Sequence, residues 1–133
     1  MKKLFAVVLI ASIVVVLIIS FSIYQTMKQK IEYEVLNIGE LPEQFQNEIA
    51  RDSESNGFSL HDDEKYTYIV YRAKHTEYEY ITTDLSVHKQ KGAYIITSIV
   101  DWAADGSKIG YEKAIKFEKV SKDDIVLEEQ DKR

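Results

Sequence analysis

The stretch LFAVVLIASIVVVLIISFSIY, residues 4–24, contains no charged side chain, and it lies between Lys2 and Lys3 on one side and Lys28 and Lys30 on the other. As an α-helix it would be roughly 31 Å long, about the thickness of the hydrocarbon core of a bilayer. Within lipid, backbone polar groups can pair only inside a helix or a closed barrel. The stretch therefore predicts a transmembrane helix.

A cleaved signal peptide is the competing interpretation of this stretch. Signal peptides carry an apolar run of about 7–15 residues before a cleavage site of the Ala-x-Ala type. The run here is longer and contains no such site, and Ser20-Phe21-Ser22 is the nearest approximation to one. An uncleaved signal-anchor is the leading interpretation, and cleavage near Ser22 stays open. A lipoprotein anchor is excluded, because the chain has no cysteine to carry the lipid.

The lysines around the stretch also predict its orientation. Lys2, Lys3 and the α-amino group slightly outweigh Lys28 and Lys30, and acidic residues count for little in this comparison. We therefore expect a single-pass protein of the cell membrane with its N-terminus inside and its domain outside. The expected parts are a cytoplasmic tail (1–3), the transmembrane helix (4–24), a stem (25–30), an extracytoplasmic α+β domain (31–129) and a tail (130–133).

Charge and composition limit what the domain can bind. All 22 acidic residues and 15 of the 17 basic residues follow residue 24, so this part carries a net charge of −7. Such a charge argues against nucleic acid as a partner and against a domain that lies flat on anionic lipid. The absence of cysteine excludes disulfides, thiol catalysis and cysteine-based metal sites.

One short helix is expected near the start of the domain. Leu41, Phe45 and Ile49 recur every four residues and form one apolar stripe. Pro42, the only proline, suits the first turn of a helix because its missing N–H has no partner there anyway.

The rest of the domain shows the two-residue alternation of β-strands. Both faces of residues 93–102 are apolar, so we expect that strand to be central and covered on both sides. Asp105-Gly106 predicts a hairpin turn into the next strand, whose pattern slips near Ala114 as a β-bulge would. The expected strands are 31–38, 65–73, 77–88, 93–102, 109–120 and 124–129. The predicted fold class is α+β, with the helix packed on one antiparallel sheet of about five or six strands.

The densest group of polar side chains is His61-Asp62-Asp63-Glu64. Asp62, Asp63 and Glu64 are weak candidates for metal ligands, since a hard cation takes several carboxylate oxygens. Consecutive side chains point in different directions, however, and the spacing of an EF-hand is absent. We therefore assign no metal, and we keep a membrane-tethered hydrolase or metal-binding enzyme that uses residues 61–64 as an alternative.

Patterns typical of other catalytic sites are missing from the sequence. There is no His-Glu-x-x-His, no Gly-x-Ser-x-Gly and no glycine-rich phosphate loop. We therefore predict no catalytic residue, no cofactor and no enzymatic activity.

Tyrosine is the residue type in clear excess, with eight of its nine copies after Tyr24. Exposed Tyr and Trp rings make rigid amphipathic contacts with partners, although tyrosine is also an ordinary half-buried strand residue. The candidate partner-binding residues are Tyr66, Tyr68, Tyr78, Tyr80 and Trp102. If Tyr78 and Tyr80 lie on an edge strand, that edge can also accept a strand from another chain.

The leading hypothesis is a small membrane-anchored domain that binds another protein or a cell-surface component without catalysis. A further alternative is a membrane subunit that acts through its transmembrane helix. The absence of Gly-x-x-x-Gly from residues 4–24 weakens this last alternative.

Overall fold

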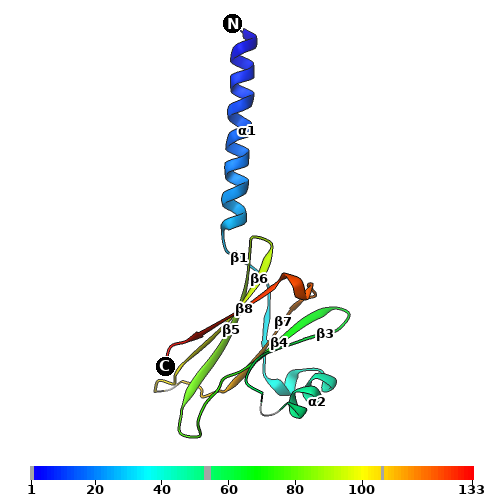
Figure 1. Ribbon diagram of the computed structural model, residues 1–133, viewed down its shortest axis with the longest axis vertical. Helices are drawn as coiled ribbons and strands as arrows, with labels where there is room; N and C mark the ends of the chain where they lie inside the picture. The colour runs from blue at the N-terminus through cyan, green and yellow to red at the C-terminus, as the bar shows by residue number, and fades with distance from the viewer. Residues whose placement is uncertain (1, 53–54, 106) are drawn as a thin grey trace.

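The computed structural model describes residues 2–52, 55–105 and 107–133, and it shows one long helix standing apart from a β-rich domain (Figure 1). The elements in chain order are α1 (Lys2–Thr26), β1 (Gln29–Lys30), β2 (Glu34–Leu36), η1 (Ile38–Glu40), α2 (Glu43–Arg51), β3 (Gly57–Asp62), β4 (Tyr66–Arg72), β5 (Ile81–Gln90), β6 (Ala93–Trp102), β7 (Glu112–Glu118), η2 (Lys122–Asp124) and β8 (Ile125–Asp131).

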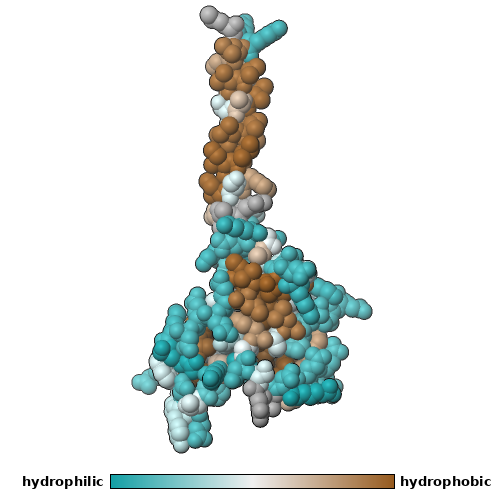
Figure 2. Space-filling model, in the orientation of Figure 1, coloured by the Kyte–Doolittle hydropathy of each residue, from teal (hydrophilic) through white to brown (hydrophobic). Residues whose placement is uncertain are grey.

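The helix α1 is exposed along its whole apolar length, and the visible face of the domain is hydrophilic at its edges with a hydrophobic patch at its centre (Figure 2). Two of its serine hydroxyls bond back to the preceding turn: Ser12 donates to the carbonyl of Val8 at 2.9 Å, and Ser22 donates to that of Ile18 at 3.0 Å. Within the described ranges, α1 is the one helix long and apolar enough to cross a membrane. It is thus compatible with a membrane anchor or a signal sequence.

The expected stem at 25–30 is not a separate segment. The helix α1 continues to Thr26, and β1 begins at Gln29. The domain therefore starts almost directly where the helix ends.

The prediction of a single antiparallel sheet is wrong, because the strands form two sheets of four. Sheet A has the order β1-β5-β6-β8, and sheet B has the order β2-β7-β4-β3. All pairs are antiparallel except β6 with β8, which run parallel. The expected hairpin between 93–102 and 109–120 is also wrong, because β6 and β7 lie in different sheets. Gly106, which belongs to the turn predicted for this hairpin, lies outside the described residues.

Two apolar clusters hold the layers together. The larger one lies between the sheets and includes Ile69 of β4, Ile96 of β6 and Ile115 of β7, each with no exposed surface. The smaller one lies on the other face of sheet B, where Phe45 and Ile49 of α2 are buried with residues of β4 and β7. The order of layers is therefore sheet A, sheet B and α2, and the predicted apolar stripe of the helix is confirmed.

This layering corrects two predictions about individual strands. The strands covered on both faces are β4 and β7. The strand β6 is covered on one face only, since its outer residues Ile95 and Ile99 are half-buried. The register of β7 with β4 is unbroken through Ala114, so there is no bulge. Ala114 and Ile115 are both buried because consecutive residues face α2 and the other sheet, respectively.

Other strand boundaries also differ from the prediction. The edge strand β3 lies outside the expected strands, although Phe58 and Leu60 alternate with Ser59 and His61. The strand β5 begins only at Ile81, and β8 extends to Asp131 into the expected tail.

Candidate functional site

The five candidate partner-binding residues fall in three different places. Tyr66 of β4 is 38% exposed and Tyr68 two residues later is 5% exposed. Tyr78, Tyr80 and Trp102 are 80%, 61% and 54% exposed. The four tyrosines therefore differ in both position and exposure.

Tyr68 is part of the core beneath α2. Its ring lies 5.2 Å from that of Phe45, and its hydroxyl donates to Asp63 at 3.2 Å. Burial raises the pKa of the Tyr68 hydroxyl above its ordinary value. Tyr68 is therefore largely covered and presents little surface to a partner, whereas Tyr66 is exposed.

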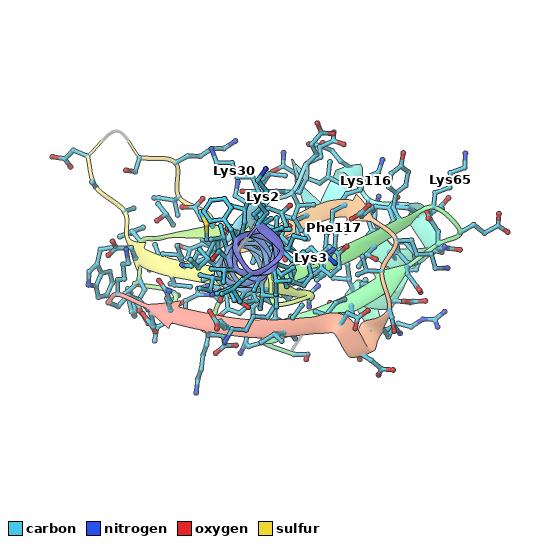
Figure 3. The ribbon with its side chains drawn as sticks, turned by 90° about the horizontal axis from the view of Figure 1, so that it is seen from above. Lys2, Lys3, Lys30, Lys65, Lys116 and Phe117 are labelled. Carbon is cyan, nitrogen blue, oxygen red and sulfur yellow. The ribbon has the colours of Figure 1, made fainter. Side chains whose placement is uncertain are left out.

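Tyr66 lines an open groove of about 630 Å³ near the end of α1. The ammonium group of Lys116 lies 4.0 Å from the centre of the Tyr66 ring, a cation–π contact. Viewed along α1, Lys30 lies beside the helix, with Lys116 farther out and Lys65 farther still (Figure 3). The groove is lined by Lys30, Ile31, Glu32, Tyr33, Glu34, Tyr66, Lys116, Phe117 and Glu118.

Tyr78 and Tyr80 lie in the connection between β4 and β5, of which residues 74–80 are here named the distal loop. It is found at the end of the domain opposite to α1 (Figure 1). The prediction that these tyrosines belong to a strand at 77–88 is wrong, so an edge strand there is not available for strand addition. Trp102 is opposite Ile81 in the β5–β6 ladder, and the N–H of Ala103 donates to the carbonyl of Tyr80 at 2.9 Å. The backbones that carry Tyr80 and Trp102 are therefore neighbours.

The distal loop is held by side chains although it has no regular secondary structure. The carboxylate of Glu79 accepts from the N–H of Thr76 at 3.0 Å, and the N–H of Glu79 donates to the carbonyl of Thr76 at 3.2 Å. The hydroxyl of Tyr111 donates to the carbonyl of Glu79 at 2.9 Å. The ring of His75 stacks on that of Tyr111 with their centres 3.8 Å apart.

Arg133 fixes the loop from the other side. Its Nη1 donates to the carbonyl of Lys74 at 2.8 Å and to the carboxylate of Glu79 at 2.9 Å. Its Nη2 donates to the carboxylate of Asp131 at 2.8 Å. The guanidinium thus joins both ends of the distal loop to the end of β8.

These contacts also favour the ionised forms of the Glu79 and Asp131 carboxyl groups. The N–H of Thr76 lowers the pKa of Glu79, and Arg133 acts in the same direction. Hydrogen bonds from Arg133 lower the pKa of Asp131 to about 2. A lowered pKa stabilises the folded state above the ordinary value of about 4, and that stabilisation disappears as the pH falls through the folded-state pKa. The loop should therefore keep these contacts at every pH above that range.

The structure thus presents two exposed tyrosines on a loop that is already ordered. Rigid aromatic side chains lose little conformational entropy on binding. A loop that is already ordered before binding also loses less backbone entropy than a flexible one. Glu79, Tyr111 and Arg133, which hold the loop, are not among the residues that the sequence pattern indicates. Their contacts join residues 32 to 59 positions apart, so no local pattern could reveal them.

The acidic group at 61–64 is dispersed among structural contacts. His61 bonds to Glu48 at 2.9 Å, and Asp62 lies 3.9 Å from the ammonium group of Lys119. Asp63 accepts from two backbone N–H groups in the β3–β4 turn, each at 2.8 Å. Among the residues that the structure describes, no three His, Cys, Asp or Glu side chains are grouped so as to hold a metal ion.

Comparisons with protein-family models, with curated protein sequences and with solved structures return no match to this chain.

Replacing Arg133 by glutamine is expected to loosen the distal loop. The change removes charged hydrogen bonds to Lys74 and Glu79, and hydrogen exchange at the amides of Thr76 and Glu79 should accelerate about fivefold. Lys132→Gln is the matched control, because the hydrogen bond of that residue to Val100 uses only its backbone N–H. Equal exchange rates in both variants would show that Arg133 does not hold the loop.

Proposed function

We propose that this chain is a single-pass membrane protein whose outer domain binds another protein or a cell-surface component through the distal loop, without catalysis. The helix α1 is the uncleaved anchor, with residues 1–3 inside and the domain outside. One observation carries the binding proposal: Tyr78, Tyr80 and Trp102 are all more than half exposed, on backbone that the surrounding contacts hold in place.

The position of the loop supports the same proposal. Its flanking strand β5 has ten residues and ends beside β1, which follows α1. At about 3.4 Å per residue, the loop lies roughly 30 Å along the strand from the membrane-facing end. A partner in solution or on an opposing surface can therefore reach the rings without contacting lipid.

The exposed rings are also the side chains that most often dominate binding energy. Tyr and Trp are enriched among residues whose truncation costs 2 kcal/mol or more in protein interfaces. Tyr66 and Tyr111, in contrast, are more than half covered.

The test is site-specific crosslinking in intact cells. A photoreactive phenylalanine derivative in place of Tyr78 should capture a discrete partner, and the same derivative at Tyr66 should not. The variant Tyr80→Ala with Trp102→Ala should reduce capture from position 78 at least about tenfold, since 1.4 kcal/mol corresponds to that factor. Equal capture from positions 66 and 78, or no effect of the double variant, would contradict binding at the distal loop.

The absence of catalysis is tested separately on the purified full-length chain. We expect no turnover with a broad panel of hydrolase substrates, with or without added divalent metal. Turnover that disappears in His61→Ala or Asp62→Asn would overturn the proposal in favour of the enzyme alternative.

A further inference from the structure

Sheet A ends at β8, a strand of seven residues whose outer side pairs with no other strand in the described part of the chain. The other edge strands are shorter: β1 has two residues, β2 has three and β3 has six. Every residue of β8 after Ile125 is exposed. Natural proteins usually shorten, cover or break a free edge, because its unpaired N–H and C=O groups can pair with another chain. The edge of β8 is therefore a candidate surface for strand addition.

The direction of the peptide groups in β8 follows from its pairing with β6. The N–H of Lys132 donates to the carbonyl of Val100 at 2.8 Å. Because the peptide groups of successive residues alternate between the two sides of a strand, even-numbered residues of β8 point toward β6. The peptide groups of Leu127 and Glu129 then point away from sheet A. A partner strand can pair with β8 through these two residues without breaking a bond to β6.

The side chains along this edge begin with an apolar part. Val126 and Leu127 are 43% and 40% exposed. Val126 lies beside Ile95 of β6, which is itself only half-buried. Figure 2 shows a hydrophobic patch in the middle of the visible face, and β6 and β8 cross this region in Figure 1. Apolar side chains on an added strand would cover part of this surface.

An acidic part follows the apolar part. Among the described residues, the ion pairs involve other carboxylates, and neither Glu128 nor Glu129 takes part in one. These two residues lie beside Thr97 and Ser98 of β6, so their neighbours on the sheet supply no cation. Opposite charges in cross-strand positions stabilise a ladder. The two carboxylates therefore favour an added strand that carries basic residues.

A second copy of this chain fits the edge poorly. In an antiparallel pair of two β8 strands centred on Glu128, that residue lies opposite its own copy, and Leu127 lies opposite Glu129. Like charges directly opposite each other destabilise a ladder. A pair centred on Leu127 places Glu128 opposite Val126, which sets a carboxylate against an apolar side chain. The charge of the edge therefore favours a different, basic partner.

We propose that the free edge of β8 binds an extended segment of another protein as an added antiparallel strand. The segment carries two basic residues opposite Glu128 and Glu129 and apolar residues opposite Val126 and Leu127. Antiparallel pairing is preferred because it is slightly more stable per residue than parallel pairing. Main-chain bonds to Leu127 and Glu129 provide affinity, whereas the side chains provide specificity. The proposal goes beyond binding by the distal loop and does not require it.

The test is hydrogen exchange of the full-length chain in phosphatidylcholine nanodiscs, with the synthetic peptide Thr-Thr-Lys-Lys-Val-Val-Thr as the probe. In the proposed register, its lysines lie opposite Glu129 and Glu128, and its valines lie opposite Leu127 and Val126. Saturating peptide should slow exchange at the amides of Leu127 and Glu129 at least about fivefold. The amides of β3, at the edge of the other sheet, should be unaffected. Identical exchange at Leu127 and Glu129 with and without the peptide would overturn the proposal.

N-methylated peptides test whether the main chain of the probe pairs with β8. Methylating the peptide residues opposite Glu129 and Leu127 removes the N–H groups that face β8, and the slowing should disappear. Methylating the residues opposite Glu128 and Val126 is the matched control, because their N–H groups face away from β8. This control peptide should still slow exchange. Equal behaviour of the two methylated peptides would be incompatible with strand addition.

Charge reversal tests the specificity of the edge. Glu128→Lys with Glu129→Lys should weaken binding of the lysine peptide at least about tenfold. The peptide Thr-Thr-Glu-Glu-Val-Val-Thr should bind this variant more tightly than it binds the wild-type chain. Glu43→Lys with Glu64→Lys makes the same change in net charge on α2 and in the β3–β4 turn, and it should leave binding of the lysine peptide unchanged. Equal weakening in both double variants would contradict recognition by the edge of β8.

Two further measurements separate this proposal from its alternatives. Exchange at Leu127 and Glu129 without peptide should not depend on the concentration of the chain. Acceleration on dilution would show pairing with a second copy and would rule out the proposed partner. Tyr80→Ala with Trp102→Ala should leave peptide binding unchanged, so failure of binding at β8 is distinguishable from failure at the distal loop.

Discussion

Replacing Ile115 by alanine is expected to lower the free energy of unfolding of the domain by about 3–4 kcal/mol. Ile115 lies on β7 opposite Ile69 of β4, and neither side chain has any exposed surface. Truncating such a residue loses the transfer free energy of the removed carbons and leaves a cavity that the two sheets close only in part. The loss is a large fraction of the 5–15 kcal/mol that typically stabilises a domain.

The measurement is urea unfolding of the detergent-solubilised chain, followed by the fluorescence of Trp102, the only tryptophan. Val126→Ala is the matched control, since Val126 is an aliphatic strand residue that is 43% exposed, and its truncation should cost less than about 1 kcal/mol. If both variants lost equal stability, the packing of one sheet on the other would not be the main source of stability.

Placing two arginines in the centre of α1 is expected to release the chain from membranes. Val14→Arg with Val15→Arg raises the free energy of insertion by about 5–7 kcal/mol on the biological insertion scale. Adjacent residues lie about 100° apart around a helix, so one partner surface cannot cover both charges. The wild-type chain should stay in the pellet after carbonate extraction, and the double variant should move to the supernatant.

Val14→Leu with Val15→Leu is the control, because it changes the same positions without charge. N-terminal sequencing of the wild-type chain from membranes should return Met1 or Lys2. A mature chain that begins near Ile23, or that carbonate removes, would identify α1 as a cleaved signal sequence. The membrane proposals would then be wrong, while the prediction for Ile115 would be unaffected.

The candidate site was only partly accessible from the sequence. Residue type alone predicts Tyr78, Tyr80 and Trp102 as interface residues, and all three are more than half exposed. The same criterion also predicts Tyr68, which is buried because α2 covers the face of β4 that Tyr68 shares with Val70. A period of two distinguishes the two faces of a strand, but it does not show which layer covers each face.

The sequence by itself determined the features that depend on local periodicity and composition. These are the apolar helix α1, the stripe of α2, the strands β4 and β6, and the excess of acid after residue 24. Only the tertiary structure decided that the strands divide into two sheets, that β8 runs parallel to β6, and that Arg133 closes the distal loop. The physical reason is that a strand carries the same alternation whichever neighbour it pairs with, whereas the choice of neighbour depends on contacts between residues far apart in the chain.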